Sequence, residues 1–293
     1  MSDTVPSGEA RAGADRRIVV SASLDNLRSS DVRFLQEAAR FGKVHVRVSS
    51  DALIAASTGR PALFPQRERL FLARALRGVD SAGVARRPVA AALPTLAPRP
   101  DRLVVTDAQD DHDLRTRCLA LDIDYRVVTE ADLAGFPPFP DEGATSPNGA
   151  SRVVVTGCFD WFHSGHIRFF MDAAAYGELY VIVGSDENVR LLKGPGHPLQ
   201  SQAERRYMVQ AARAVHRALI STGTGWMDAA PEIDALAPQV YVVNEDGDQP
   251  EKRAFCKARG LEYVVLKRKP HRALPTRTST HLRSVNVHAP KAM

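Results

Sequence analysis

VVVTGCFDWFHSGH, residues 153–166, carries the strongest indication of the fold. Its three valines predict a buried strand, the glycine-containing segment after them predicts a tight turn, and an amphipathic helix is expected from about Ile167 to Tyr176. His163 and His166 therefore lie at the start of that helix. A helix start offers unpaired backbone N–H groups and the positive end of the helix dipole, which suit a phosphate. The two imidazoles could donate to the phosphate oxygens during transfer.

The longer pattern around these histidines, Gly157-Cys158-Phe159-Asp160-x-x-His163-x-Gly165-His166, resembles the HxGH signature of a nucleotidyltransferase superfamily. That superfamily includes cytidylyltransferases, pantetheine-phosphate adenylyltransferase and heptose-phosphate adenylyltransferases. The resemblance implies catalytic roles for the two histidines. It implies nucleotide binding for the segment around them, namely Gly157, Cys158, Phe159, Asp160 and Gly165. For Asp160 a second interpretation stays open, in which its carboxylate fixes the turn.

Length and composition describe a globular chain of two ordinary domains. The chain has 293 residues, 44% of them hydrophobic and 25% charged. No apolar run approaches the roughly 18 residues needed to span a bilayer, so no membrane span is expected. The polar segment 1–17 lacks the apolar core of a secretory signal and is expected to be a disordered lead-in.

Cysteine content and charge indicate the cellular compartment and the class of substrate. Cys118, Cys158 and Cys256 are widely spaced, which favours reduced thiols in the cytoplasm and argues against a zinc site, so no metal site built by the protein is expected. The net charge is +5 and the isoelectric point is about 9.3. Because the basic residues are scattered beside acidic ones, a phosphorylated substrate is favoured over nucleic acid.

The chain contains two copies of one unit. Residues 18–25, which end at Asp25, face residues 153–160, which end at Asp160, at an offset of 135. One inserted residue later, Glu68-Arg69 faces Glu204-Arg205. Agreement across several elements at a nearly fixed period indicates an internal duplication.

Each copy alternates short apolar runs with helical segments, which is typical of a parallel sheet covered on both faces. We therefore predict an α/β fold of two tandem Rossmann-like, doubly wound parallel-sheet domains, with the ligand site at the carboxyl ends of the strands. In the second copy the predicted strands are 152–156, 179–184, 218–221, 240–243 and 262–266. The predicted helices are 166–176, 201–213, 227–236 and 249–259.

The predicted organisation has four parts. They are a disordered N-terminus (1–16), a degenerate cytidylyltransferase-like domain (17–131), a linker rich in Pro, Gly and Ser (132–151) and a catalytic domain (152–293). In the first copy, Arg28 and Asp31 stand opposite the two histidines, so this half has lost the phosphate chemistry. It could be a structural or dimer-forming half, which makes a homodimer possible, or it could keep a binding or regulatory role.

The resemblance assigns further site residues in the second copy. Lys193, predicted to lie on a flexible loop, would reach the reacting phosphates. Hydroxyl groups near the C-terminus would hold the triphosphate at a second helix start, for which Thr278 is a plausible N-cap. The remaining candidates for nucleotide binding are Arg205, Arg213, Asp246, Thr278, Ser279 and Thr280.

The implied reaction is nucleotidyl transfer. The phosphate of a small-molecule acceptor attacks the α-phosphorus of a nucleoside triphosphate, pyrophosphate leaves, and Mg²⁺ accompanies the triphosphate. The tandem arrangement resembles ethanolamine-phosphate cytidylyltransferase, which favours CTP with a phosphorylated alcohol. The Gly-Cys-Phe-Asp segment also occurs in heptose-phosphate adenylyltransferases, which keeps ATP with a sugar phosphate as an alternative. A non-catalytic nucleotide sensor or scaffold is an alternative of another class.

Overall fold

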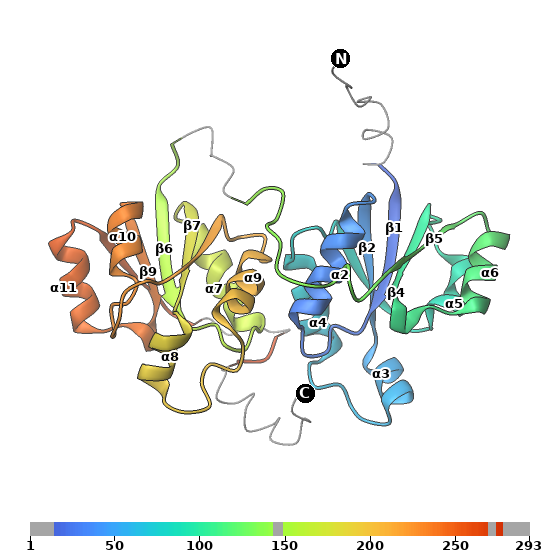
Figure 1. The fold of residues 1–293 in the computed structure, drawn as a ribbon, viewed down its shortest axis with the longest axis horizontal. Helices are drawn as coiled ribbons and strands as arrows, with labels where there is room; N and C mark the ends of the chain where they lie inside the picture. Colours follow the sequence, from blue (N-terminus) through green and yellow to red (C-terminus); the bar gives the residue numbers. More distant parts are fainter. Residues whose placement is uncertain (1–14, 143–148, 269–273, 278–293) are drawn as a thin grey trace, which may run out of the picture. The chain divides into compact units, whose positions relative to one another are not determined.

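The computed structural model describes residues 15–142, 149–268 and 274–277. The chain divides into two compact units, Met1–Gly135 (unit 1) and Phe136–Met293 (unit 2). Figure 1 shows a parallel sheet with helices on both sides in each unit.

Unit 1 is built on a five-stranded parallel sheet with the strand order β3-β2-β1-β4-β5. Its strands are β1 (Arg17–Ala22), β2 (Lys43–Ser49), β3 (Ser81–Ala85), β4 (Arg102–Thr106) and β5 (Asp124–Val128). Its helices are α2 (Ser29–Ala39), α3 (Asp51–Thr58), α4 (Gln66–Ala75), α5 (Val89–Ala92) and α6 (His112–Ala120), with 3₁₀ turns η1 (Leu93–Thr95) and η2 (Asp107–Gln109).

Unit 2 repeats this topology with the order β10-β9-β6-β7-β8. Its strands are β6 (Arg152–Gly157), β7 (Glu178–Val183), β8 (Arg217–Ile220), β9 (Val240–Asn244) and β10 (Glu262–Leu266). Its helices are α7 (Ser164–Ala174), α8 (Asp186–Lys193), α9 (Gln202–Gln210), α10 (Ala230–Leu236) and α11 (Pro250–Ala258), with the 3₁₀ turn η3 (Glu245–Gly247). The predicted tandem α/β fold is confirmed.

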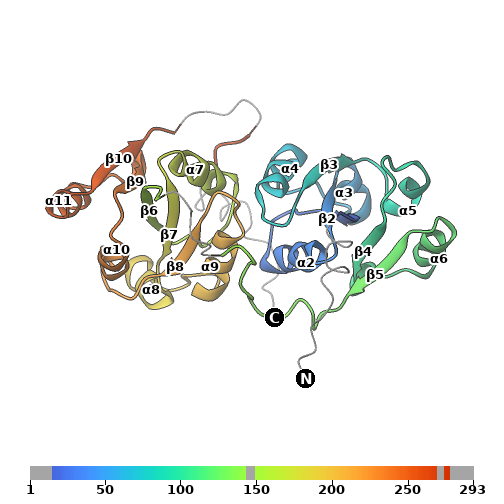
Figure 2. The same ribbon diagram turned by 90° about the horizontal axis from the view of Figure 1, so that it is seen from above.

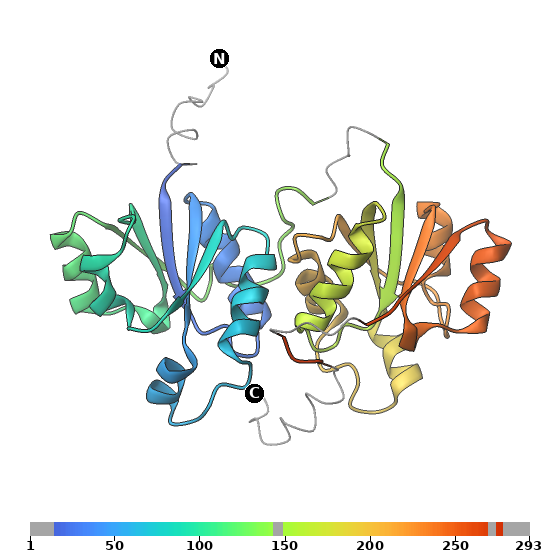
Figure 3. The same cartoon turned by 180° about the vertical axis from the view of Figure 1, so that it is seen from behind.

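The central strand of unit 2 shows why the sheet needs cover on both faces. Val153, Val154 and Val155 are all fully buried, although successive side chains of a strand point to opposite faces. Helices α7 and α9 contact strands β6, β7 and β8 on one face. Helices α10 and α11 cover the other face through a cluster that contains Ile233 and Cys256. Figures 2 and 3 show these layers from above and from behind.

The predicted strands of unit 2 agree with the structure to within about one residue at each end. The helix predictions need two corrections. Residues 186–193 form helix α8, whereas Lys193 was expected on a loop. Helix α9 ends at Gln210, so Arg213 lies beyond it. No helix in the described ranges is long and apolar enough to cross a membrane.

Part of the segment predicted as a linker packs within unit 2. The rings of Phe136 and Phe139 lie 5.4 and 5.3 Å from the ring of Tyr207 on α9. Glu142 forms an ion pair of 2.6 Å with Arg206. Residues 136–142 therefore cover α9, although they form no helix or strand.

Candidate functional site

His163 is the N-cap of helix α7 and is only 3% exposed. Its Nδ1 accepts a hydrogen bond of 3.1 Å from the backbone N–H of Gly165. An imidazole nitrogen that accepts this bond carries no proton, so the neutral ring holds its proton on Nε2. The cap thus fixes the tautomer that presents an Nε2–H donor.

His166 lies in the first turn of the same helix, stacked on His163 with the ring centres 3.9 Å apart. The rings of Phe159 and Phe162 also contact it, at 5.2 and 5.9 Å between centres. The Nδ1 atom of His166 is buried and has no hydrogen-bond partner within the described chain. An unsatisfied buried polar atom costs roughly 1–3 kcal/mol, which a ligand atom could offset.

The surroundings keep both imidazoles neutral. Burial lowers the pKa of His163 to about 4, with smaller contributions from the charges of Arg277 and Arg268. Burial lowers the pKa of His166 well below its usual value, and His163, Lys193 and Arg268 lower it further. At neutral pH the site therefore contains two neutral N–H donors surrounded by fixed positive charge.

Gly165, between the two histidines, leaves room for this arrangement. A Cβ at this position would lie 2.9 Å from the Cε1 and Nδ1 atoms of His163 and 3.3 Å from the carbonyl oxygen of Arg277. Gly157 has a similar role at the end of β6, because a Cβ there would lie 2.8 Å from the ring of Phe159. The two glycines of the motif thus allow close packing.

Asp160 is 3% exposed, and its carboxylate holds the loop that precedes α9. Its Oδ1 accepts hydrogen bonds from the backbone N–H groups of Leu199 (2.5 Å) and Gln200 (3.2 Å). Its Oδ2 lies 3.4 Å from Nδ1 of His197. Of the two roles that the sequence left open for Asp160, this geometry supports the one of fixing the backbone.

Arg205 is fully buried, and its guanidinium joins three segments of unit 2. It donates to the carbonyl oxygens of Cys158 (2.7 Å), Gly184 (2.7 Å) and Gln200 (3.0 Å) and to Asp186 (2.8 Å). These bonds hold the carboxyl ends of β6 and β7 together. These bonds use four of the five N–H donors of a fully buried guanidinium, so this geometry supports a positioning role for Arg205.

Lys193, the last residue of α8, is exposed. Its positive charge lowers the pKa of both His166 and Cys158, which places its ammonium beside the site. Burial has the larger effect on Cys158 and raises the pKa of its thiol. The predicted catalytic trio of two imidazoles and one ammonium is therefore brought together.

A cavity of about 150 Å³ opens beside His166. Its lining includes Arg168 from α7, Lys267 and Arg268 after β10, and Arg277. Sequence reasoning missed the first three. A signal for Lys267 and Arg268 was available, because they directly follow a strand whose carboxyl end belongs to the ligand-binding edge of the sheet.

The other predicted binding residues differ in their setting. Asp246, in the η3 turn, pairs with Arg268. Arg213 is exposed. Thr278, Ser279 and Thr280 lie outside the described residues.

In unit 1 the equivalent helix start is capped by the chain itself. The carboxylate of Asp31, on α2, accepts a hydrogen bond of 2.9 Å from the backbone N–H of Arg28. Burial raises the pKa of Asp31. A carboxylate thus takes one of the backbone donors that a phosphate would use.

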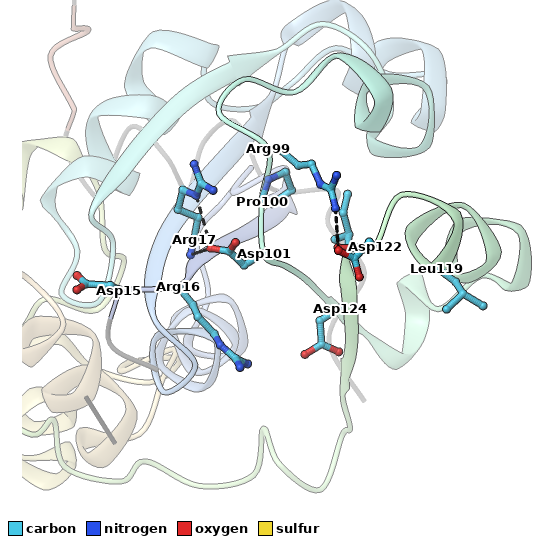
Figure 4. Close-up of a pocket in the computed structure, with 10 residues that line it drawn as sticks. Asp15, Arg16, Arg17, Arg99, Pro100, Asp101, Leu119, Asp122 and Asp124 are labelled. Atoms are coloured by element: carbon cyan, nitrogen blue, oxygen red, sulfur yellow. Dashed lines mark hydrogen bonds and ion pairs between the residues drawn. The ribbon is translucent and has the colours of Figure 1, made fainter. Parts of the chain in front are cut away.

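A separate hollow of about 910 Å³ lies at the amino-terminal edge of the unit 1 sheet (Figure 4). Arg17 pairs with Asp101 at 3.5 Å, and Arg99 pairs with Asp122 at 3.3 Å. These four charges therefore neutralise one another in pairs.

Comparison with known proteins finds a family and several relatives that are similar to unit 2. A family model described as cytidylyltransferase-like matches residues 154–286. The FAD synthase of Aciduliprofundum boonei is 32% identical over 123 residues, which are 41% of this chain and 79% of that protein. The FAD synthase of Methanocella paludicola is 31% identical over 136 residues, 45% of this chain and 94% of that protein. The bifunctional protein HldE of Methylococcus capsulatus is 39% identical over 97 residues, 32% of this chain but only 20% of that protein.

Proposed function

The chain belongs to the cytidylyltransferase-like family of nucleotidyltransferases, and we propose that unit 2 transfers a nucleotidyl group from a nucleoside triphosphate to a phosphorylated small molecule. The observation that carries the proposal is the stacked, neutral pair His163 and His166 at the start of α7, with an unsatisfied Nδ1 on His166.

In this reaction an oxygen of the acceptor phosphate attacks the α-phosphorus in line. A new P–O bond forms, the bond between the α-phosphorus and the bridging oxygen breaks, and pyrophosphate leaves with the electron pair. The attacking phosphate is already an anion, so no general base is needed. Catalysis then depends on positioning and on stabilising the charge that develops on the phosphoryl oxygens.

The chain's own residues supply that stabilisation. His163 and His166 donate N–H groups from a site that excludes water, where a hydrogen bond to an anion is strong. Lys193, Arg268 and Arg277 bring positive charge toward the same imidazoles, as the lowered pKa values of the two histidines indicate. Their charge would draw the two anionic reactants together.

Mg²⁺ is implied by the triphosphate chemistry, where it would neutralise charge on the phosphate oxygens. In the part of the chain that the structure describes, no three His, Cys, Asp or Glu side chains gather as metal ligands. The charged residues that line the cavity are four cations, Arg168, Lys267, Arg268 and Arg277, and one carboxylate, Asp172. These residues do not fit a metal site of their own, and we propose that the ion is held by the nucleotide.

Two nucleotides are candidates. The similarity to FAD synthases favours ATP, because FAD contains an adenylyl group joined through a pyrophosphate bond to a phosphorylated acceptor. The tandem arrangement of two similar units favours CTP, as predicted from the sequence. For the acceptor we propose a phosphorylated alcohol or sugar, with a phosphorylated flavin as a third class suggested by the relatives.

The test is a pyrophosphate-release assay with ATP and CTP against a panel of these acceptors. We expect one nucleotide and one acceptor class to give turnover. Nucleotide binding without turnover across the whole panel would contradict the proposal and favour the sensor or scaffold.

His166→Ala tests the site itself. Removing one donor to a developing oxyanion costs about 10²–10³ in turnover, so we expect a loss of this order with the fold retained. The matched control is His112→Ala, an exposed histidine on α6 of unit 1, which should leave turnover unchanged. Equal turnover in both variants would refute the assigned site.

A further inference from the structure

One face of the unit 1 sheet differs in character from its counterpart in unit 2. In unit 2, neighbouring strands place Thr156, Ile182 and Leu219 side by side in register. Ile182 belongs to the apolar cluster of α10 and α11, and Leu219 packs against that cluster. At the same three positions unit 1 has Ser21, Arg47 and Gly83. An apolar pair beneath a helix is thus replaced by an arginine beside a glycine.

Arg47 is 6% exposed, and its guanidinium is bonded without a carboxylate. It donates to the hydroxyl of Ser21 (3.2 Å) and to the carbonyl oxygen of Arg87 (3.0 Å). Burial, and then the charge of Arg87, lower the pKa of Arg47. An arginine nevertheless stays protonated at neutral pH, so the fold holds a buried positive charge here.

The missing counter-charge distinguishes this residue from the other buried arginines of the described chain. Arg33 pairs with Glu37 at 2.9 Å. Arg69 and Arg205 each pair with an aspartate, at 2.6 and 2.8 Å. Buried charges in proteins are generally paired, because leaving water without a partner costs several kcal/mol.

A second arginine lies next to Arg47, since the backbone carbonyl oxygen of Arg87 accepts its hydrogen bond of 3.0 Å. Arg87, just after β3, is exposed and donates to the hydroxyl of Thr95 at 3.2 Å. It too has no carboxylate partner among the described residues. Gly83, beside Arg47 on β3, adds no side chain to this face, and a Cβ built there would be in ordinary contact with the ring of His45 at 3.7 Å. The pair lies toward the carboxyl ends of the strands, where doubly wound sheets bind ligands.

We propose that Arg47 and Arg87 form an anion site in unit 1 that binds a phosphate group. Two guanidinium forks held by hydroxyl and carbonyl groups suit the tetrahedral oxygens of phosphate, and the bound anion would supply the missing counter-charge. The site is distinct from the imidazole site of unit 2. The first half, which lost the phosphate-binding helix start, would thus keep a phosphate site at another place on its sheet.

The experiment is calorimetric titration of the full chain with inorganic phosphate. Arg268→Met serves as the background, because it weakens the cationic cavity of unit 2. In this background we expect one binding event, which Arg87→Met weakens at least about 10-fold, since a charge-assisted hydrogen bond is lost. Arg86→Met, at the exposed neighbouring arginine, is the matched control and should bind like the background. Glycerol 3-phosphate as a second titrant separates a site for free phosphate from one for a phosphorylated metabolite.

Arg47→Leu is the second variant, because it restores the apolar character that Ile182 has in unit 2. We expect it to lose phosphate binding and to keep or raise the midpoint of thermal unfolding. If Arg47→Leu fails to fold, Arg87→Met still tests phosphate binding, because Arg87 is exposed and its substitution leaves the core unchanged. No binding in the background, or equal affinity in Arg87→Met and Arg86→Met, would overturn the proposal. Neither result depends on whether unit 2 shows turnover.

Discussion

The two histidines of the motif owe their protonation state to burial. His163 is 3% exposed, and the charges nearest to it are positive. A neutral imidazole is therefore the stable form before substrate binds. A bound triphosphate would oppose this effect and raise the pKa of both rings, so that protonation could follow the charge of the substrate.

This burial predicts a pH dependence of stability. The pKa of His163 is about 4 in the fold, against 6.5 for an ordinary histidine. Between these values the unfolded chain binds a proton that the folded chain does not, so the free energy of unfolding falls as the pH drops below about 6.5. The loss from this residue is complete below about 4. At about pH 5 it is of the order of 2 kcal/mol.

Urea unfolding at about pH 7.5 and pH 5 measures this effect. We expect His163→Asn to lose less stability between the two pH values than the wild type does. An identical loss in both proteins would mean that His163 does not carry the effect.

Gly165→Ala tests the close packing between the rings. Alanine favours a helix by roughly 1 kcal/mol over glycine, yet its Cβ would press against the His163 ring at 2.9 Å. We expect the imidazole to be displaced, with turnover lowered about 10- to 100-fold while the stability changes by about 1 kcal/mol or less. Pyrophosphate release and urea unfolding provide the two measurements. Undiminished turnover would show that the ring position is not critical.

At the scale of the elements, both units use the same brace at the carboxyl ends of their first two strands. Arg69 of unit 1 donates to the carbonyl oxygens of Ser23 and Ser49, each at 2.6 Å, and pairs with Asp51. Arg205 makes the corresponding bonds in unit 2. Because unit 1 keeps the brace after losing both histidines, the brace serves the fold.

The same holds for the aspartate that follows the first strand of each unit. Asp25 accepts hydrogen bonds from the backbone N–H groups of Leu63 (2.9 Å) and Phe64 (2.7 Å). Asp160 accepts the equivalent pair from Leu199 and Gln200. A residue kept in both copies thus marks structure, whereas one kept only in unit 2 marks the chemistry.

Arg205→Met should destabilise unit 2 by about 3–5 kcal/mol, because Asp186 and three carbonyl oxygens lose their partner. Arg69→Met should do the same in unit 1. Both tryptophans, Trp161 and Trp226, belong to unit 2, so their fluorescence during urea unfolding reports on that unit.

The control is Arg190→Met, an exposed arginine on α8, which should change stability by less than about 0.5 kcal/mol. A similarly small effect of Arg205→Met would show that the brace is dispensable.

On the scale of the whole molecule, the duplication gives two sheets that each have their own core. The clusters around Leu103 in unit 1 and around Tyr241 in unit 2 draw all their residues from within one unit. The aromatic contacts of Phe136 and Phe139 also stay inside unit 2.

Residues 136–293 are therefore expected to fold without unit 1. We expect this fragment to unfold cooperatively in urea, with a tryptophan fluorescence midpoint close to that of the full chain. A fragment that binds hydrophobic dyes and lacks a cooperative transition would show instead that unit 2 depends on unit 1.

Sequence patterns were enough to predict the tandem α/β architecture, the strand positions of unit 2 and the place of His163 and His166 at a helix start. These features depend on periodicity and on neighbouring residues, which are local properties of the chain. Helix α8 (Asp186–Lys193) was not predicted from the sequence. The segment 191–196, in which the helix ends, contains two glycines and a proline and therefore resembles a loop.

The role of each polar side chain became clear only in the folded chain. Arg205 was assigned to nucleotide binding from the sequence and Asp160 had two roles left open, yet most of their partners are backbone groups brought close by the fold. Arg268 joins the site from about a hundred residues beyond His166, and Arg47 shows its missing counter-charge only once its neighbours on the sheet are known. Hydrogen bonds and ion pairs between distant segments depend on burial and distance, which no local pattern encodes.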